Sequence, residues 1–303
     1  METVTPDKPM TAKDLNPELW KIFDEYVHGF IDRRGFLDRA SKYAVGGLTA
    51  AGILDLMNPK FAEAQIVPTD DKRIKTERVD VAAPNGNGKI RAYVVKPANA
   101  TGKLPTVVVI HENRGLNPHI EDIARRMALD GFLAVAPDAL TPLGGYPKEG
   151  EDKARELFPK LDQAKTREDM VAVVSYAKAR PDSNGKVGAV GFCYGGGMVN
   201  YLAARMPNDI QAGVPFYGGA GPLEDVKNVK AAMLVHHGST DERLVAAWPA
   251  HEAALKAAGV RYEGYVYQGA AHGFNNNTTE RFHPEAAKLA WDRTIAFFNK
   301  YLS

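Results

Sequence analysis

The feature that most constrains the fold is a series of short apolar runs that alternate with segments of helical periodicity. The clearest run, LPTVVVIHE at 104–112, is rich in β-branched residues and lacks polar alternation, as is typical of strands buried on both faces of a sheet. We expect further strands of this kind at 132–140, 186–192, 212–218, 231–238 and 262–269. A hairpin with an Asn-Gly turn is expected before them, with strands at 73–83 and 89–97.

Segments with helical spacing lie between most of these strands. We expect helices at 118–129, 149–160, 164–180, 195–206, 245–258 and 284–302. Strands that alternate with helices in this way predict a mostly parallel, doubly wound sheet with helices on both faces, that is, the α/β class. In such a sheet the chemistry collects at the carboxyl ends of the strands.

Residues 1–65 precede this domain, which we assign to 66–303, and they allow two interpretations. Leu19, Phe23, Tyr26 and Phe30 share one face of a helix predicted at 17–31, which favours a helical arm in a cytoplasmic protein and a role in homo-oligomer formation. The alternative is a twin-arginine-type export signal that ends near Ala64, because the motif DRRGFLD is followed by an apolar run and by A-E-A at 62–64. That apolar run, 44–54, is shorter than the roughly 20 residues of a membrane span.

Charge and residue usage exclude several classes of function. The chain carries 38 basic and 37 acidic side chains without a basic run, so no nucleic acid partner is expected. A single cysteine excludes an intramolecular disulfide and a cysteine-based zinc site. His236 and His237 are consecutive on a predicted strand and point to opposite faces, and no H-E-x-x-H motif is present, so no metal is expected. No G-x-G-x-x-G motif follows the first strand, and no cofactor is expected.

The only cysteine, Cys193, lies in the motif G-F-C-Y-G-G directly after the strand 186–192. This is the G-x-nucleophile-x-G pattern of a nucleophile elbow, with Cys in place of the commoner Ser. Side chains at Gly191 and Gly195 would collide with neighbouring elements in such a turn, and the following helix would direct its amino end at the sulfur. The alternative interpretation is a small core cysteine at a glycine-rich turn.

A base and an orienting acid are available after Cys193 in the chain order of hydrolases with this elbow. Asp241 follows the strand 231–238, and His272 follows the last strand. His272 would accept the thiol proton, and Asp241 would orient its imidazole. Asp241 could instead only cap the next helix.

The loop after the strand 104–112 supplies the remaining candidate groups. The backbone amides of Asn113 and Tyr194 would form an oxyanion hole. Glu112 would place a carboxylate near the nucleophile, where it would raise the pKa of the thiol and moderate it. The alternative for Glu112 is a surface carboxylate paired with Arg114 or Arg126.

The motifs G-F-C-Y-G-G, H-E-N-R-G, S-T-D-E and A-H-G-F together resemble those of the dienelactone hydrolase family, the carboxymethylenebutenolidase-like branch of the α/β-hydrolases. The resemblance covers about residues 75–303 and implies an α/β-hydrolase fold. It implies a triad of Cys193, Asp241 and His272, with Glu112 as the carboxylate that holds the resting thiol. It also implies a substrate pocket with Arg114, Tyr146 and Tyr217.

One departure concerns the substrate. The family binds a substrate carboxylate with arginines, one of them a few residues after the histidine, where this chain has HGFNNNTT. The residues therefore predict a cysteine-dependent hydrolase of small activated esters or lactones, acting through a thioester acyl-enzyme, without specifying butenolides. Two alternatives remain: a hydrolase of thioesters or peptide-like substrates, and a non-enzymatic scaffold with a redox-sensing cysteine.

Overall fold

A computed structural model describes residues 11–27, 29–45 and 48–303. The chain divides into two compact units, 1–60 and 61–303, and each has its own hydrophobic core. Among the residues that the structure describes, no helix combines the length and the apolar character needed to cross a membrane.

The first unit is helical. Its helices are α1 (Glu18–Val27), α2 (Arg33–Ala40) and α3 (Ala50–Met57), with single 3-10 turns at Ala12–Asp14 and Ser41–Tyr43. Asp32 and Thr49 cap α2 and α3 by accepting hydrogen bonds from the amides of Gly35 and Gly52.

The helix predicted in this unit is confirmed, although it is shorter than expected. Leu19, Phe23 and Tyr26 are buried on one face of α1 and pack against side chains from α2 and α3. The prediction was wrong for Phe30, which is 74% exposed, because α1 ends at Val27 and the helical periodicity no longer applies there.

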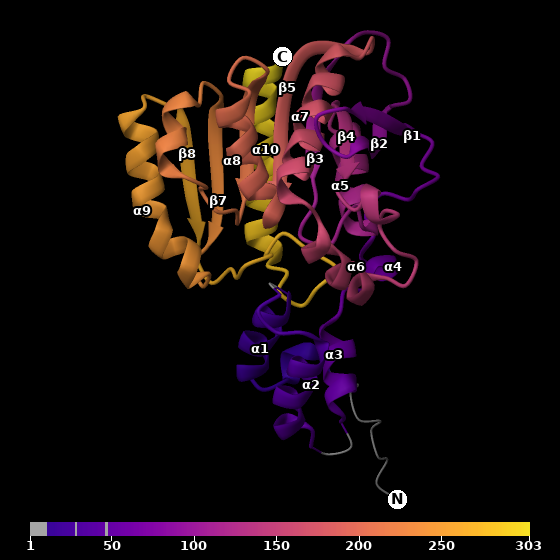
Figure 1. The fold of residues 1–303 in the computed structure, drawn as a ribbon, viewed down its shortest axis with the longest axis vertical. Coiled ribbons are helices and arrows are strands. Elements are labelled where there is room, and N and C mark those ends of the chain that lie inside the picture. Colours follow the sequence, from indigo (N-terminus) through magenta and orange to yellow (C-terminus); the bar gives the residue numbers. More distant parts are fainter. Residues whose placement is uncertain (1–10, 28, 46–47) are drawn as a thin grey trace, which may run out of the picture. The chain divides into compact units, whose positions relative to one another are not determined.

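The second unit is built on an eight-stranded sheet with the strand order β1-β2-β4-β3-β5-β6-β7-β8 (Figure 1). The strands are β1 (Ile74–Ala83), β2 (Gly88–Pro97), β3 (Leu104–Ile110), β4 (Leu133–Asp138), β5 (Ser183–Phe192), β6 (Ile210–Phe216), β7 (Ala232–Gly238) and β8 (Tyr262–Tyr267). β2 pairs antiparallel with both β1 and β4, and all other neighbours are parallel. The predicted hairpin and mostly parallel sheet are confirmed.

Helices cover both faces of the sheet, as Figure 1 shows. One face carries α5 (Pro118–Leu129) and α10 (Pro284–Leu302), and the other carries α7 (Gln163–Ala179), α8 (Tyr194–Arg205) and α9 (Glu242–Ala257). Two short helices, α4 (Phe61–Ala64) and α6 (Glu151–Leu157), complete the unit with 3-10 turns at Thr141–Leu143, Phe158–Lys160 and Leu223–Asn228. β4 is buried along its whole length and β3 from Thr106 onward, and both strands are mainly apolar because each of their faces meets a helix layer.

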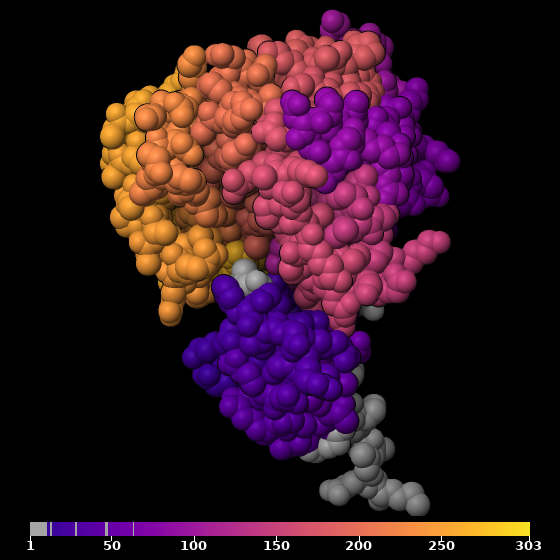
Figure 2. Space-filling model, viewed as in Figure 1, coloured from indigo at the N-terminus to yellow at the C-terminus, as the bar shows by residue number. Residues whose placement is uncertain are grey.

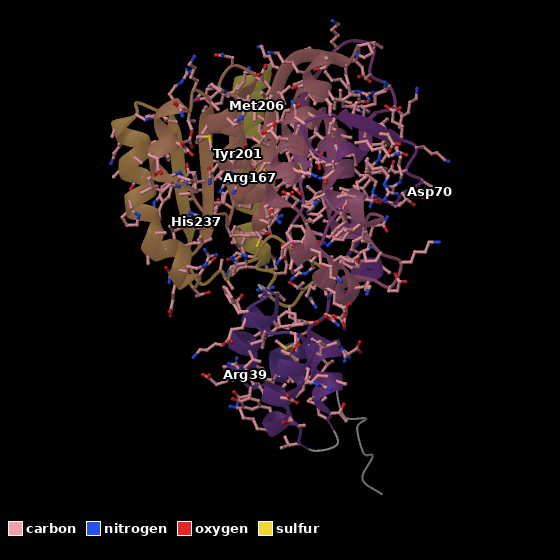
Figure 3. All side chains as sticks on the ribbon, viewed as in Figure 1. Arg39, Asp70, Arg167, Tyr201, Met206 and His237 are labelled. Carbon is pink, nitrogen blue, oxygen red and sulfur yellow. The ribbon has the colours of Figure 1, made fainter. Side chains whose placement is uncertain are left out.

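The order of the elements across the sheet can also be followed on the surface of this unit. Figure 2 shows its chain segments passing from purple at the β1–β2 edge to orange at β8 and α9. Between these edges α7 and α8 are linked by Arg167, whose guanidinium lies 5.1 Å from the ring centre of Tyr201 (Figure 3).

Residues 64–67, called here the anchored segment, are tied to the rest of the second unit by hydrogen bonds. Asp122 Oδ1 accepts from the amides of Ile66 and Val67 at 3.2 and 2.8 Å, and Arg125 Nε donates to the Val67 carbonyl at 2.7 Å. Asn277 Nδ2 donates to the Ala64 carbonyl at 2.6 Å. These bonds fix the point at which the chain enters this unit.

Candidate active site

Cys193 lies in the sharp turn between β5 and α8, at the carboxyl edge of the parallel strands. Its φ of 54° is in the left-handed region, which is rare for residues other than glycine. The Cys193 amide donates to the Phe216 carbonyl at 3.0 Å and its carbonyl accepts from the Gly197 amide at 3.2 Å, so both sides of the turn are held. The sulfur is therefore presented at the amino end of α8.

The glycines around Cys193 are required by close backbone contacts. A Cβ on Gly191 would lie 2.1 Å from the Gly195 carbonyl oxygen, and one on Gly195 would lie 2.3 Å from the Ile110 oxygen. Real Cβ atoms essentially never come this close to another heavy atom. The end of β3 and the start of α8 consequently approach more closely than any side chain would allow.

Asp241 and His272 meet from two neighbouring loops. Asp241, in the loop between β7 and α9, and His272, in the loop after β8, are joined by a contact of 2.6 Å between Oδ2 and Nδ1. Burial acts to lower the pKa of His272, but the nearby Cys193 sulfur and the hydrogen bond with Asp241 outweigh it and raise the pKa above the ordinary value. A hydrogen bond between His272 and Cys193 contributes in the same direction. The structure thus brings the three predicted residues into one line.

Glu112 is buried beside this line and has an arginine partner. Arg114 Nη1 donates to Glu112 Oε2 at 3.2 Å, and Asn276 Nδ2 donates to the same oxygen at 3.3 Å. Burial opposes ionisation of Glu112, but the surrounding positive charges, that of Arg114 above all and that of Arg281 among the others, together outweigh it and lower the pKa of the carboxyl. Of the two arginines considered for Glu112, Arg114 makes the ion pair and Arg126 does not. The surface position considered for Glu112 is wrong, because the residue is 6% exposed.

The predicted pocket residues Arg114 and Tyr146 are linked through Glu151, which the sequence analysis did not identify. Arg114 Nε lies 2.9 Å from Glu151 Oε2, and the Tyr146 hydroxyl donates to Glu151 Oε1 at 3.1 Å. Burial and the Glu151 carboxylate both raise the pKa of Tyr146, so its phenol stays neutral. Arg114 is therefore held between two carboxylates.

Tyr217 follows β6 with a φ of 38° and is fully buried among aromatic rings. Its ring centre lies 5.0 Å from that of His272. The hydroxyl has no hydrogen-bond partner among the described residues. Burial raises the pKa of Tyr217, and the charges of Glu112 and Cys193 act in the same direction. The phenol is therefore a neutral donor beside the catalytic candidates.

Asn113 and Tyr194 come from the two segments that approach each other at Gly195. Asn113 belongs to the loop after β3, and Tyr194 is the first residue of α8. A Cβ on Gly195 would lie within 2.7 Å of the His111 carbonyl oxygen, so the two backbones are adjacent. The Tyr194 ring is fixed by an edge contact with Phe158, with 4.8 Å between ring centres.

Two further residues of the site were not predicted from the sequence. Arg281 lies in the loop between β8 and α10, and its charge acts on both Glu112 and Tyr217. The stretch HGFNNNTT has no arginine, but Arg281 follows it two residues later and brings a guanidinium to this site. His119 in α5 is buried, and its pKa is lowered to about 4, chiefly by burial, so its imidazole is neutral. Neither residue belongs to a recognisable motif.

Asp138 and the consecutive histidines have structural surroundings. Asp138 accepts hydrogen bonds from the amides of Leu116, Leu140 and Tyr146 and so joins two loops at this edge. His236 contacts Thr294 of α10, whereas His237 packs against Trp248 of α9, so they face opposite sides of the sheet. Within the described part of the chain, no group of three or more His, Cys, Asp or Glu side chains is placed to hold a metal ion.

A mostly parallel sheet with a strained elbow after β5 and an Asp–His pair on the two following loops defines an α/β-hydrolase. The sequence profile of the dienelactone hydrolase family matches residues 90–302. The chain belongs to the dienelactone hydrolase family and is a hydrolase. A second profile, described as YqhI-like, matches residues 7–45.

Individual proteins show the same relationship. A protein of Synechocystis sp. (strain ATCC 27184 / PCC 6803 / Kazusa), whose name places it among the carboxymethylenebutenolidases, is 31% identical over 76% of this chain and 98% of its own length. A hydrolase fragment of Escherichia coli K12 named YghX is 50% identical over 38% of this chain and 97% of its own length. A crystal structure from Klebsiella pneumoniae subsp. pneumoniae MGH 78578, named as a dienelactone hydrolase, superposes with a TM-score of 0.63 at 30% identity. It covers 75% of this chain and 100% of the Klebsiella chain.

Proposed function

We propose that this hydrolase uses Cys193 as its nucleophile and cleaves small activated esters or lactones through a thioester acyl-enzyme. The observation that carries the proposal is the hydrogen-bonded line of Cys193, His272 and Asp241 at the elbow. An acid, a base and a nucleophile in this order form the arrangement by which hydrolases activate a weak nucleophile.

In the proposed reaction, His272 takes the proton of the Cys193 thiol while the sulfur attacks the carbonyl carbon. The negative charge then develops on the carbonyl oxygen, which the amides of Asn113 and Tyr194 would stabilise. As the intermediate collapses, the alkoxide leaves with the proton from His272 and a thioester remains on Cys193. Water, deprotonated by His272, then attacks this thioester and releases the carboxylic acid and the thiol.

We further propose that the Glu112 carboxylate holds the resting thiol of Cys193 and that an acidic substrate breaks this contact when it binds. The support is the pairing of Glu112 with Arg114, because an incoming carboxylate would compete with Glu112 for the same guanidinium. Arg281 adds a second positive charge near Glu112 and Tyr217. Tyr146 and Tyr217 would line the pocket for the body of the substrate. These charges favour an ester or lactone that carries a carboxylate, in keeping with the names of the relatives.

The first test compares a neutral and an acidic substrate, p-nitrophenyl acetate and a dienelactone. Cys193→Ala should abolish hydrolysis of both substrates. Cys193→Ser should retain a reduced rate, because a serine hydroxyl is a weaker nucleophile than a cysteine thiolate. When the wild-type reaction is quenched with acid, mass spectrometry should find the acyl group on Cys193 and on no other residue. Equal rates in the wild type and Cys193→Ala would refute the proposed nucleophile.

Arg281→Gln tests the substrate charge separately. We expect kcat/KM for the dienelactone to fall by at least about tenfold, since one charge-assisted contact is lost, while hydrolysis of p-nitrophenyl acetate is retained. Loss of both activities to the same extent would show that Arg281 serves the fold rather than the substrate.

For the first unit, we infer that it is a folded part of a cytoplasmic protein rather than a cleaved export signal. Phe36 of the twin-arginine motif is fully buried, and it shares a core with Ile53 and Leu54 of the apolar run. A signal that is removed has no need of such a core. Cell fractionation with intact-mass measurement should find the uncut chain in the cytoplasm, and a form that begins at Gln65 would contradict this inference.

We also propose that the first unit joins copies of the chain. Phe30 and Val45 are large apolar residues that are 74% and 71% exposed in this unit, and burying such side chains favours association. Light scattering after gel filtration should give an oligomer for the wild type and a smaller species for Phe30→Ser. An unchanged mass in the variant would exclude this surface.

A further inference from the structure

A cavity of about 220 Å³ lies in the unit 61–303. Its walls come from the anchored segment, α5, the loop after β8 and the start of α10, and none of the triad residues lines it. The volume exceeds the roughly 150 Å³ of a buried cavity that accommodates benzene. A ligand with a single ring or a short chain would therefore fit.

Arg126 of α5 lines this cavity and has no anionic partner within the described residues. Its guanidinium lies 3.9 Å from the ring centre of Trp291, and no carboxylate is within 4.0 Å of it. The two acidic side chains that act on Arg126 from further away have other partners: Asp122 accepts from the anchored segment, and Asp130 accepts from Trp291 Nε1 at 3.0 Å. A largely buried cation is normally paired, so this one is open to an anion.

The two asparagines of the cavity wall offer no second donor to a ligand. Asn275 is 2% exposed, and its Nδ2 has no hydrogen-bond partner among the described residues. That nitrogen is closed off from solvent, so it does not face the cavity and a ligand there cannot reach it. Asn277 also lines the cavity, but its Nδ2 donates to the Ala64 carbonyl.

The remaining walls are mainly apolar. Phe282, Pro284, Ala287 and the ring of Trp291 form them, with Ile66 of the anchored segment. Lys288 also lines the cavity, but its ammonium is paired with Asp292 at 2.6 Å. The cavity thus combines the Arg126 guanidinium with a mainly apolar surface. Inorganic phosphate would leave that apolar surface uncovered, whereas an organic carboxylate would use both the guanidinium and the apolar walls.

We propose that this cavity is a binding site for a monocarboxylate with an aromatic or short aliphatic body. The carboxylate accepts hydrogen bonds from the Arg126 guanidinium. The apolar body lies against Phe282, Pro284 and Trp291. This site is separate from the proposed reaction, because Asn276, between the two asparagines of the cavity, points its amide at Glu112 instead.

Calorimetric titration of the full chain with benzoate and with neutral benzamide tests the proposal. Benzoate should bind the wild type, and benzamide should bind at least about tenfold more weakly because it lacks the charge. Arg126→Gln should weaken benzoate binding at least about tenfold, and Arg126→Lys should give an intermediate affinity, since an ammonium keeps the charge without the planar fork. Arg293→Gln is the matched control: Arg293 also stacks on a ring, Tyr265 at 3.6 Å, but does not line the cavity.

Benzoate could also bind at the arginines of the candidate active site, and Arg281→Gln separates the two. Binding that is lost in Arg281→Gln and unchanged in both Arg126 variants would overturn the proposal, as would equal affinities for benzoate and benzamide. Arg126→Gln should keep the wild-type rate with p-nitrophenyl acetate, which shows that it folds. If Arg126→Gln does not fold, the change in tryptophan fluorescence on adding benzoate decides instead. This change must be present in the wild type and reduced in Arg126→Lys. It must be absent in Trp291→Phe, which assigns it to the ring in the cavity.

Discussion

Asp241 serves two partners with its two carboxylate oxygens. Oδ1 accepts from the Leu244 amide at 3.4 Å and caps α9, while Oδ2 lies 2.6 Å from His272 Nδ1. The two interpretations considered for this residue from its position in the sequence are therefore compatible. Because the cap fixes the carboxylate, its second oxygen is held in place at His272.

Removing the charge of Asp241 should change the titration of His272. Burial lowers the pKa of His272, and the contacts with Cys193 and Asp241 raise it, so Asp241→Asn should move the pKa downward. We expect kcat/KM for p-nitrophenyl acetate to fall by at least about tenfold, because the imidazole loses its orienting partner. The imidazole proton signal in NMR titrations, assigned by its absence from His272→Gln, checks the direction. An unchanged midpoint would mean that Asp241 acts on α9 alone.

At the scale of elements, the site depends on how closely α8 approaches β3. No side chain fits between them at Gly195, where a Cβ would lie 2.3 Å from the Ile110 oxygen and 2.7 Å from the His111 oxygen. The helix can therefore bring its first amide next to the loop after β3. Further along the same helix, a Cβ on Gly197 would have its nearest neighbour at 3.6 Å.

These two glycines give a matched pair of variants. Gly195→Ala should destabilise the protein by about 1–3 kcal/mol, as overpacking does, and should lower ester hydrolysis because α8 must move away from β3. Gly197→Ala should be neutral or slightly stabilising, since alanine is the better helix former. Urea unfolding and esterase rates should be measured for both variants. Equal effects of the two substitutions would contradict the claim that α8 and β3 leave no room for a side chain at Gly195.

At the scale of the whole molecule, most histidines are buried and neutral. Burial lowers the pKa of five of them: His111, His119, His236, His237 and His251. For His119, His237 and His251 the pKa is about 4, against an ordinary 6.5. Between these two values the unfolded chain binds protons that the folded chain does not, so stability falls as the pH falls from 6.5 to 4.

We therefore expect acidification from pH 7 to pH 5 to lower Tm by more than about 5 °C. His251→Gln should reduce this difference, because its side chain cannot take up a proton and the pKa of His251 is lowered by burial alone. Calorimetric scans of both proteins at the two pH values provide the comparison. A Tm that does not change with pH would show that these histidines are accessible to protons in the folded protein.

The strands could be predicted from the sequence because a strand buried on both faces is a continuous apolar run, whatever its neighbours are. The elbow could be predicted because glycines, nucleophile, strand and helix are contiguous. Arg281 could not, because the loop after β8 is irregular and only its fold returns the guanidinium to Glu112. The cavity at Arg126 could not either, since its walls come from residues as far apart as Ile66 and Trp291.

The left-handed backbone at Cys193 has a consequence for how this chain could evolve. Glycine adopts a φ of 54° without strain, so a sequence chosen only for stability would place glycine at this position. A side chain with a sulfur stands there instead, at a conformational penalty. Natural drift towards greater stability therefore works against catalysis at this one position, and thermal selection without a screen for turnover would tend to erase the enzyme while it improves the fold.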